Sequence, residues 1–163
     1  MATWTQFTAD APRIAEIFTR RHAATGKLCM LATLRADGFP RISPMEPQIF
    51  AGRLLLIGMP GTRKFEDLRR DPRLSLHTAT VDTQVADGDA KLWGEARDVP
   101  DPALFEQFAE SLFVESGMDL RGQAFDHFYE VDIFGASSVE VIGERLDVTV
   151  WKPGASERVI EKH

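Results

Sequence analysis

The chain has 163 residues, 44% of them hydrophobic, which is enough apolar material to fill the core of one domain. Its 25 acidic residues outnumber its 19 basic residues, so the formal net charge is -6 at pH 7. A chain of this charge has no overall attraction for nucleic acid or for an anionic membrane. Any site that binds an anion must therefore be built locally.

Cysteine content and hydropathy exclude several classes of protein. Cys29 is the single cysteine, so an internal disulfide and a multi-cysteine metal cluster are both ruled out. No apolar run approaches the roughly 20 residues that cross a bilayer, and the chain begins without the charged-then-apolar pattern of a signal peptide. We expect a cytoplasmic protein with a single domain over residues 1–163 and neither a membrane nor a nucleic-acid partner.

The first predicted elements are one helix and one strand. Apolar side chains recur at helical spacing over residues 10–24, and Gly26 follows them, which predicts a short amphipathic helix. Residues 27–34 are apolar at nearly every position, a pattern typical of a strand that is buried on both faces.

A hairpin is predicted next. The Asp-Gly pair at 37–38 favours a tight turn, and residues 41–50 return as a second strand. Pro44 and Pro47 cannot donate hydrogen bonds to a neighbouring strand, so this strand should lie at a sheet edge or bend at a bulge. Together with a strand expected over residues 54–58, these segments would form an antiparallel meander.

The middle of the chain continues with a helix and two strands. A Pro-Gly turn at 60–61 precedes a helix over residues 62–70, and a strand is expected over 73–80. A polar loop then leads to a strand over residues 90–99, in which small and apolar residues face one way and charged residues with Trp93 face the other.

The last third contains the clearest helix. Residues 101–117 begin with Asp101 as the N-cap and end at Gly117, and an apolar stripe predicts a packing role for this helix. Strands follow over residues 124–143, with a turn near Gly135, and over 145–153. With about six strands or more, about three helices and no βαβ alternation, the chain is predicted to be mainly β, as a Greek-key or meander barrel with flanking helices.

The common catalytic and phosphate-binding motifs are absent. Lys64 follows Gly61 by three positions and Phe65 stands where a P-loop needs a hydroxyl, so there is no P-loop. The sequence also lacks the dinucleotide-binding, nucleophile-elbow and zinc-protease motifs. No catalytic residue is identified, and no metal site is expected, because no pair of histidines has metal-ligand spacing among His22, His77, His127 and His163.

Arg63 and Lys64 stand at the predicted start of the helix over residues 62–70. Unpaired backbone N–H groups and the positive end of the helix dipole meet there, so two cations are unfavourable by roughly 0.3–1 kcal/mol each unless an anion is bound. A phosphate would bind favourably at this point, and Thr62 would add a hydroxyl group to the site. The alternative is that both cations extend into solvent or pair with nearby acids.

Arg41 strengthens the anion hypothesis. It lies two strands back in the expected meander, from which a neighbouring strand would bring it beside Arg63 and Lys64. Three cations from two chain segments suggest a binding site. The alternative for Arg41 is an ion pair with Asp37 at the edge of the hairpin loop.

Two stretches of the chain resemble a known family. The segments LATLRADGFPRISPM and GMPGTRKFEDLRRDPRLSL, in this order, are similar to the flavin-binding split barrels related to pyridoxamine phosphate oxidase, in which a G-x-P-R hairpin precedes a helix opened by [ST]-[RK]-K. The match extends over about residues 27–99, and WKPG at 151–154 resembles a weaker feature near the C-terminus of some members.

The resemblance implies a six-stranded split barrel that forms a homodimer and holds flavin mononucleotide (FMN) in a groove between its subunits. It also implies roles for individual residues. Arg63 and Lys64 would grip the phosphate, Thr62 would add a hydroxyl near it, and the backbone of Ile57 and Gly58 would approach the flavin ring. Positions on the second strand would line the cofactor groove: Arg41, Ile42, Ser43 and Pro44.

Two departures from the family pattern argue against oxidation of pyridoxamine phosphate itself. Glu46 stands in place of a lysine, and the C-terminal segment WKPGASERVIEKH lacks the R-L-x-P element that helps to bind the vitamin. The leading hypothesis is a flavin-type oxidoreductase that uses FMN, or the deazaflavin coenzyme F-420, on a small organic substrate. His77 and Trp93 are candidates for the substrate side, although both residue types also occur in strands with no such role.

The competing hypothesis is a module that binds FMN, F-420 or haem for storage, transport or sensing without turnover. Haem would require an axial ligand, for which the candidates are His22, His77 and His127.

Overall fold

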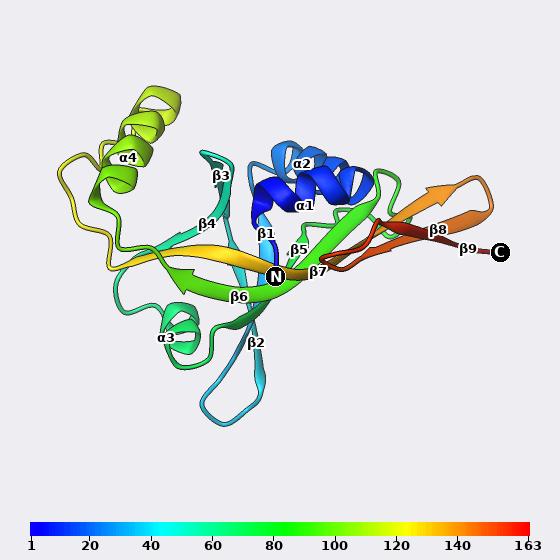
Figure 1. Cartoon of the computed structure of the whole chain (residues 1–163), viewed down its shortest axis with the longest axis horizontal. Helices are drawn as coiled ribbons and strands as arrows, with labels where there is room; N and C mark the ends of the chain where they lie inside the picture. Colours follow the sequence, from blue (N-terminus) through cyan, green and yellow to red (C-terminus); the bar gives the residue numbers. More distant parts are fainter.

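The computed structural model describes all 163 residues, which form four helices and one antiparallel sheet of nine strands (Figure 1). The helices are α1 (Trp4–Asp10), α2 (Pro12–Ala24), α3 (Arg63–Arg70) and α4 (Pro102–Ser116). The strands are β1 (Cys29–Leu34), β2 (Pro40–Met45), β3 (Gln48–Phe50), β4 (Arg53–Gly58), β5 (Arg73–Thr78), β6 (Asp89–Asp98), β7 (His127–Ile142), β8 (Arg145–Trp151) and β9 (Arg158–Lys162).

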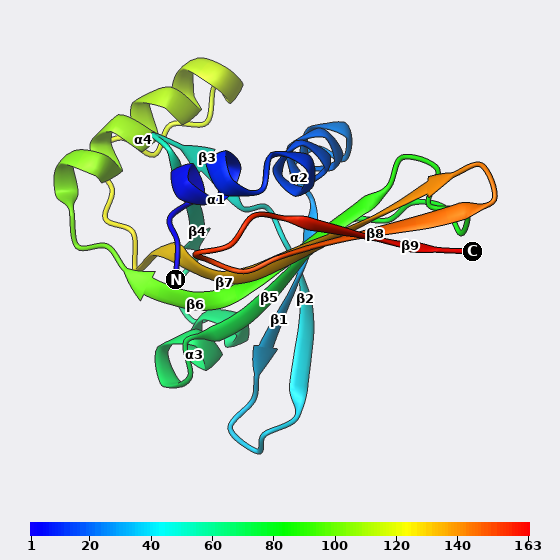
Figure 2. The ribbon, with the colours of Figure 1, turned by 45° about the vertical axis from the view of Figure 1, so that its right-hand side comes forward.

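The sheet runs in the order β2-β1-β5-β6-β7-β4-β3, and β8 and β9 extend it beyond the far end of β7. The β1–β2 hairpin and the β7–β8 hairpin project from the body in different directions (Figures 1 and 2). Helices α1 and α2 cover one face of the strongly twisted sheet, and α4 stands apart from both (Figures 1 and 2). No helix is both long and apolar enough to cross a membrane.

The main core lies between α1, α2 and the sheet. It joins 25 buried residues, with Phe7 and Phe18 from the helices packed over Leu31, Leu92 and Val131 from the strands. A second, smaller cluster lies under α4 and is made of Leu55, Val99, Leu104, Phe108 and Phe128. Helix α4 therefore rests on a core of its own.

The helix predicted over residues 10–24 is confirmed as α2, and a second helix that was not predicted, α1, precedes it. Pro12 lacks an N–H group and its ring would clash with the preceding turn of a continuous helix, so the chain breaks at Ala11 between α1 and α2. Ala11 offers no capping side chain, and the cap comes from the β8–β9 loop instead. There, the carboxylate of Glu157 accepts hydrogen bonds from the backbone N–H groups of Arg13 (3.0 Å) and Ile14 (3.3 Å).

Nine strands replace the six that the resemblance implied, and four helices replace three. The strands that the sequence did not predict separately are β3, which Pro47 separates from β2, and β9; the strand expected over residues 145–153 is confirmed as β8. The turn expected near Gly135 is wrong, because β7 runs unbroken through this residue. A β-carbon at Gly135 would lie 2.2 Å from the Trp93 ring, so this glycine is needed for the indole to lie across β7.

Strand pairing also differs from the expected meander. β4 pairs with β3 and β7 and does not pair with β2, which forms one edge of the sheet as its prolines predicted. Strand β1 alternates between buried and partly exposed residues and is not buried on both faces. The alternation predicted for residues 90–99 is confirmed, as are the N-cap Asp101 and the left-handed Gly117 that bound α4.

Candidate functional site

Helix α3 begins at the end of β4, and its first residues are the two cations singled out in the sequence. The first intrahelical hydrogen bonds are those from Phe65 and Glu66 to the Thr62 carbonyl, at 3.1 Å each. The backbone N–H groups of Arg63 and Lys64 lie before these bonds and have no partner within the helix, as is usual in the first turn of a helix. The Thr62 hydroxyl donates to the Met59 carbonyl (3.1 Å) and does not cap the helix.

The two cations at this helix start have different surroundings. Arg63 is 77% exposed and pairs with Glu66 at 3.0 Å, which is a surface ion pair of small energy. Lys64 is half-buried, and its Nζ donates to the Pro44 carbonyl at 2.8 Å. Lys64 forms no ion pair with a carboxylate, so its ammonium group remains available to a bound anion.

A buried carboxylate fixes α3 against the β1–β2 hairpin. Asp67 is 3% exposed, and its Oδ2 accepts hydrogen bonds from Arg41 Nε (2.6 Å) and the Thr33 hydroxyl (2.9 Å), while Oδ1 accepts from Arg70 (3.2 Å). Burial alone would raise the pKa of Asp67, but these three hydrogen bonds outweigh it and lower the pKa below its ordinary value.

The expected alternative partner of Arg41 is wrong, because Asp37 pairs with Arg35 (3.1 Å) and Arg41 pairs with Asp67. Arg41 still lies beside α3, but it reaches the helix across β1 rather than along a meander. Its guanidinium is paired with Asp67, which Arg70 also contacts. Arg41 therefore positions α3 and does not offer a free cation.

Two pockets flank the start of α3. One, here called the arginine pocket, has a volume of about 380 Å³ and is lined by Arg35, Arg41, Arg63 and Arg70 with Asp37, Glu66 and Asp67. Each of the four arginines in it pairs with one of the three acids. Asp67 is shared by Arg41 and Arg70, so four cations face three acids and the pocket keeps one positive charge in excess.

The other pocket, here called the groove, has a volume of about 430 Å³ and lies between the ends of β2 and β4, α3 and α4. Most of its lining is apolar, and Glu46 and Lys64 are its charged residues. A pocket of this volume with few polar groups is typical of a small-molecule site. The lining comprises Leu28, Pro44, Met45, Glu46, Gln48, Ile57, Gly58, Met59, Thr62, Lys64, Phe65, Phe108, Leu112, Met118 and Leu120.

The nine predicted site residues fall into three groups: those that line the groove, those that line the arginine pocket, and those that line neither. Pro44, Ile57, Gly58, Thr62 and Lys64 line the groove, whereas Arg41 and Arg63 line the arginine pocket. Ile42 is 73% exposed and points away from α3, and Ser43 lies half-buried on the opposite side of β2, so neither lines either pocket.

Gly58 permits the close packing of α3 on β4. A β-carbon at Gly58 would lie 1.8 Å from the Phe65 ring, so no other residue fits without moving the helix start. The Phe65 ring stacks on His127, with centroids 4.9 Å apart and planes 10° apart. Burial and the charge of Arg69 lower the pKa of His127, which suits a neutral imidazole in this stack.

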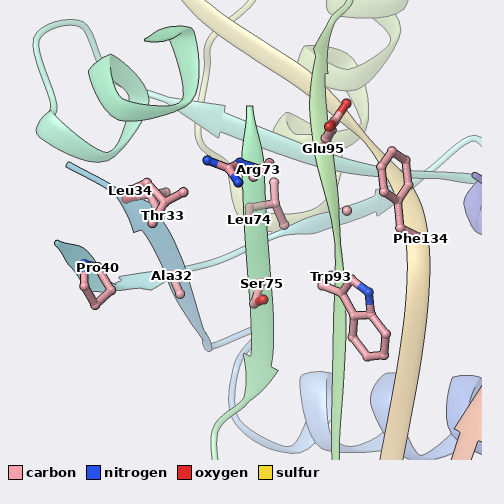
Figure 3. Close-up of a pocket in the computed structure, with 11 residues that line it drawn as sticks. Ala32, Thr33, Leu34, Pro40, Arg73, Leu74, Ser75, Trp93, Glu95 and Phe134 are labelled. Carbon is pink, nitrogen blue, oxygen red and sulfur yellow. The ribbon is translucent and has the colours of Figure 1, made fainter. Parts of the chain in front are cut away.

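A third pocket lies on the sheet face that no helix covers (Figure 3). This sheet-face hollow has a volume of about 370 Å³, and its floor is made by the small residues Ala32, Ser75 and Gly94. Trp93 and Phe134 stand on one side of it, where they are 36% and 37% exposed, and Pro40 and Leu34 stand on the other (Figure 3).

The other reactive side chains lie outside these pockets. His77 is half-exposed on β5, 3.8 Å from Asp89, whereas His22 is buried with its Nε2 2.7 Å from the Pro47 carbonyl. Burial raises the pKa of the Cys29 thiol to about 12, so it is not a nucleophile. No group of three or more His, Cys, Asp or Glu residues is arranged to hold a metal ion.

Sequence reasoning missed the wall of the groove that α4 provides. The apolar stripe of Phe108 and Leu112 indicated packing, and both residues do reach the small core under α4. They also line the groove, together with Met118 and Leu120 from the loop that follows. Helical periodicity identifies an apolar face, but it does not distinguish a face that packs in a core from one that lines an open pocket.

Comparison with known proteins identifies the family of this chain. The family model described as pyridoxamine 5'-phosphate oxidase matches residues 18–134. A comparison with curated proteins finds no significant match.

Several solved structures share the architecture. A pyridoxamine 5'-phosphate oxidase-related, FMN-binding protein from Nostoc punctiforme superposes with a TM-score of 0.63 at 14% identity, over 93% of this chain and 95% of its own. A haem-binding protein from Mycobacterium smegmatis gives 0.61 at 22% identity, over 85% of this chain and 58% of its own. PhzG from Burkholderia lata, solved with tetrahydrophenazine-1-carboxylic acid, gives 0.55 at 14% identity, over 89% and 90%.

We predict that Asp67→Asn destabilises the protein in a pH-dependent way. The pKa of Asp67 is lowered in the folded state, so its contribution to the free energy of unfolding is present above the unfolded pKa, near 4, and is lost as pH falls through the folded value. Urea unfolding at pH 7 should show a loss of about 2 kcal/mol. The difference from wild type should shrink below about pH 4.

Asp37→Asn is the matched control, because it removes the exposed pair with Arg35. Its effect should stay below about 1 kcal/mol at every pH. A difference for Asp67→Asn that is the same at pH 7 and pH 3 would contradict the assignment of a stabilising, ionised Asp67.

Proposed function

Because the chain belongs to the pyridoxamine 5'-phosphate oxidase family, we propose that it binds FMN by the phosphate at the start of α3 and uses it to oxidise or reduce a small organic substrate. The observation that carries the proposal is Lys64. It is a half-buried cation with no carboxylate partner, and it lines an otherwise mostly apolar groove at a helix N-terminus.

The residues at the start of α3 fit a phosphate. The free N–H groups there, the helix dipole and Lys64 all favour a negative charge at the same point. Arg63 is held only by an exposed ion pair with Glu66, so it can turn to a phosphate at small cost. Thr62 lies beside them and can exchange its bond to the Met59 carbonyl for one to a phosphate oxygen.

The rest of the groove suits the flavin ring. Ile57 and Gly58 end β4 on the groove, where their backbone groups can meet the polar edge of the ring, while the apolar lining excludes water. Bound FMN would supply hydride-transfer chemistry. The role of the chain is then to grip the phosphate, orient the ring and leave one side of it open to substrate.

Oxidation of pyridoxamine phosphate is not part of this proposal. Glu46 lies on the groove and has no cationic partner, so it disfavours a second phosphate there. The C-terminal segment, which the resemblance links to vitamin binding, is taken up by β9, and this strand pairs with β8.

A second candidate is a binding module without turnover, for FMN, F-420 or haem. One observation favours it: the groove contains no histidine, and Glu46 is the sole carboxylate on its lining. A protein that only stores or carries a coenzyme needs no proton donor, whereas most reductions of an organic substrate do.

We further propose that the chain forms a homodimer through the uncovered sheet face. The sheet-face hollow exposes Trp93 and Phe134, and Ile42, which is 73% exposed, pairs with the hollow residue Ala32 and shares its face. Exposed apolar side chains gathered on one face are typical of an interface. A two-fold axis through this face would let the projecting residues of each copy enter the hollow of the other.

Replacement of Lys64 tests the coenzyme site. Isothermal titration of purified protein with FMN should show binding, and Lys64→Ala should weaken it by about tenfold to a hundredfold, because a charge-assisted hydrogen bond contributes roughly 1.5–3 kcal/mol. Lys162→Ala on β9 is the control and should bind like wild type. Equal affinity of Lys64→Ala and wild type would refute the phosphate assignment.

The same titration with F-420 and haem, followed by absorbance during reduction and reoxidation with an added acceptor, separates the two candidates. Repeated bleaching and recovery of the flavin band would support the oxidoreductase. Tight binding with no turnover for any acceptor would favour the binding module.

Replacement of Trp93 tests the dimer. Sedimentation should give a mass of twice 18.2 kDa for wild type, and Trp93→Glu should shift it toward the monomer, because a charge would have to be buried in the interface. Val141→Glu, at a residue that is 44% exposed on the β7–β8 arm, should remain dimeric. A monomeric wild type would disprove the dimer.

A further inference from the structure

The groove has an entirely apolar wall on the side of α4. Phe108 and Leu112 come from the helix itself, and Met118 and Leu120 come from the loop that follows it. These four residues are here called the α4 wall. They face the part of the groove formed by α3 and the ends of β2 and β4.

The loop after α4 is folded back so that the wall is complete. Arg121 pairs with Asp119 at 2.9 Å and lies 3.8 Å above the Phe113 ring, and the N–H of Gly122 donates to Glu106 at 3.3 Å. These contacts hold residues 118–122 against α4. They also keep Met118 at the groove, although this methionine is 56% exposed and is not part of any core.

Helix α4 is also tied to the rim of the groove. Lys27, which precedes β1, lies 2.9 Å from Glu115 in the last turn of α4 and 3.1 Å from Gln48, which lines the groove. Lys27 adopts a left-handed backbone conformation (φ 71°), which is uncommon for a residue other than glycine. The bridge sets the distance between the α4 wall and the strands opposite.

The composition of the groove defines the ligand that would lie against this wall. Lys64 and Glu46 carry opposite charges, so the lining as a whole is neutral. The α4 wall has no polar side chain, and a polar or charged group placed against it would lose its hydrogen bonds to water without replacement. A thioether such as Met118 adapts its shape to an apolar ring and makes favourable contacts with aromatic ones.

We infer that the α4 wall receives an uncharged, planar, apolar ring molecule. If the proposed function is right, this molecule lies beside the coenzyme ring and is the substrate. Its binding to the wall does not depend on the proposed function. The phosphate and the polar edge of a flavin find their partners at α3 and at the end of β4. The α4 wall offers neither of these groups a hydrogen bond, so we assign it to a second molecule.

The test uses the uncharged two-ring quinone menadione as the probe. Equilibrium dialysis against the full chain, with and without FMN, measures its affinity. Met118→Asp should weaken menadione binding at least tenfold, because the carboxylate would be desolvated by the ring. Val114→Asp, in the last turn of α4 just before the loop that carries Met118, is the matched control, since Val114 is 77% exposed and does not line the groove. Its affinity should stay within twofold of wild type.

A second variant keeps the test decisive if Met118→Asp does not fold, as circular dichroism would reveal. Leu120→Asn introduces a polar amide on the same wall and should weaken menadione binding severalfold. The inference is overturned if wild type does not bind menadione, or if the wall variants bind it as well as Val114→Asp does.

FMN titration of the same variants separates this inference from the proposed function. FMN affinity should change less than twofold in Met118→Asp. An equal loss for FMN and menadione would assign the wall to the coenzyme, and loss of the dimer instead would assign it to a second copy of the chain; either result overturns the inference. If wild type binds menadione in the expected pattern but does not bind FMN, the proposed function fails and the inference stands.

Discussion

The candidate site depends on one buried carboxylate. Asp67 takes hydrogen bonds from Thr33 on β1, from Arg41 on β2 and from Arg70 in its own helix, and so joins α3 to the hairpin beside it. Without these bonds, an eight-residue helix would be only marginally stable. With them, its first turn is held at the end of β4, where the groove opens.

The same carboxylate decides which cations are free to bind a ligand. Asp67 pairs with both Arg41 and Arg70, and Arg63 pairs with Glu66, so each arginine that lines the arginine pocket beside α3 already has an acidic partner. Lys64 is left without a carboxylate and faces the groove. Of the basic residues in this part of the sequence, only Lys64 lines the groove; Arg63 lies beside it at the helix start, and Arg69 lies at the other end of α3, against another pocket. The proposed phosphate site rests on this division.

The sequence predicted well what depends on neighbours along the chain. The caps of α4 follow from Asp101 and Gly117, and the edge position of β2 follows from Pro44, because capping residues and proline act locally. It did not predict that β4 pairs with β7, that Arg41 reaches Asp67 or that Glu157 caps α2. These contacts join segments that are far apart in the chain. From the sequence alone, a charged side chain has several possible partners, and nothing in the sequence selects one of them.

The central claim is that the start of α3 binds the phosphate of a flavin. It is tested most directly by titrating the wild-type protein with FMN and with riboflavin, which differ only by that phosphate. The account predicts that riboflavin binds at least about tenfold more weakly, since charge-assisted bonds to the phosphate contribute roughly 1.5–3 kcal/mol each. Equal affinities for the two flavins would contradict it.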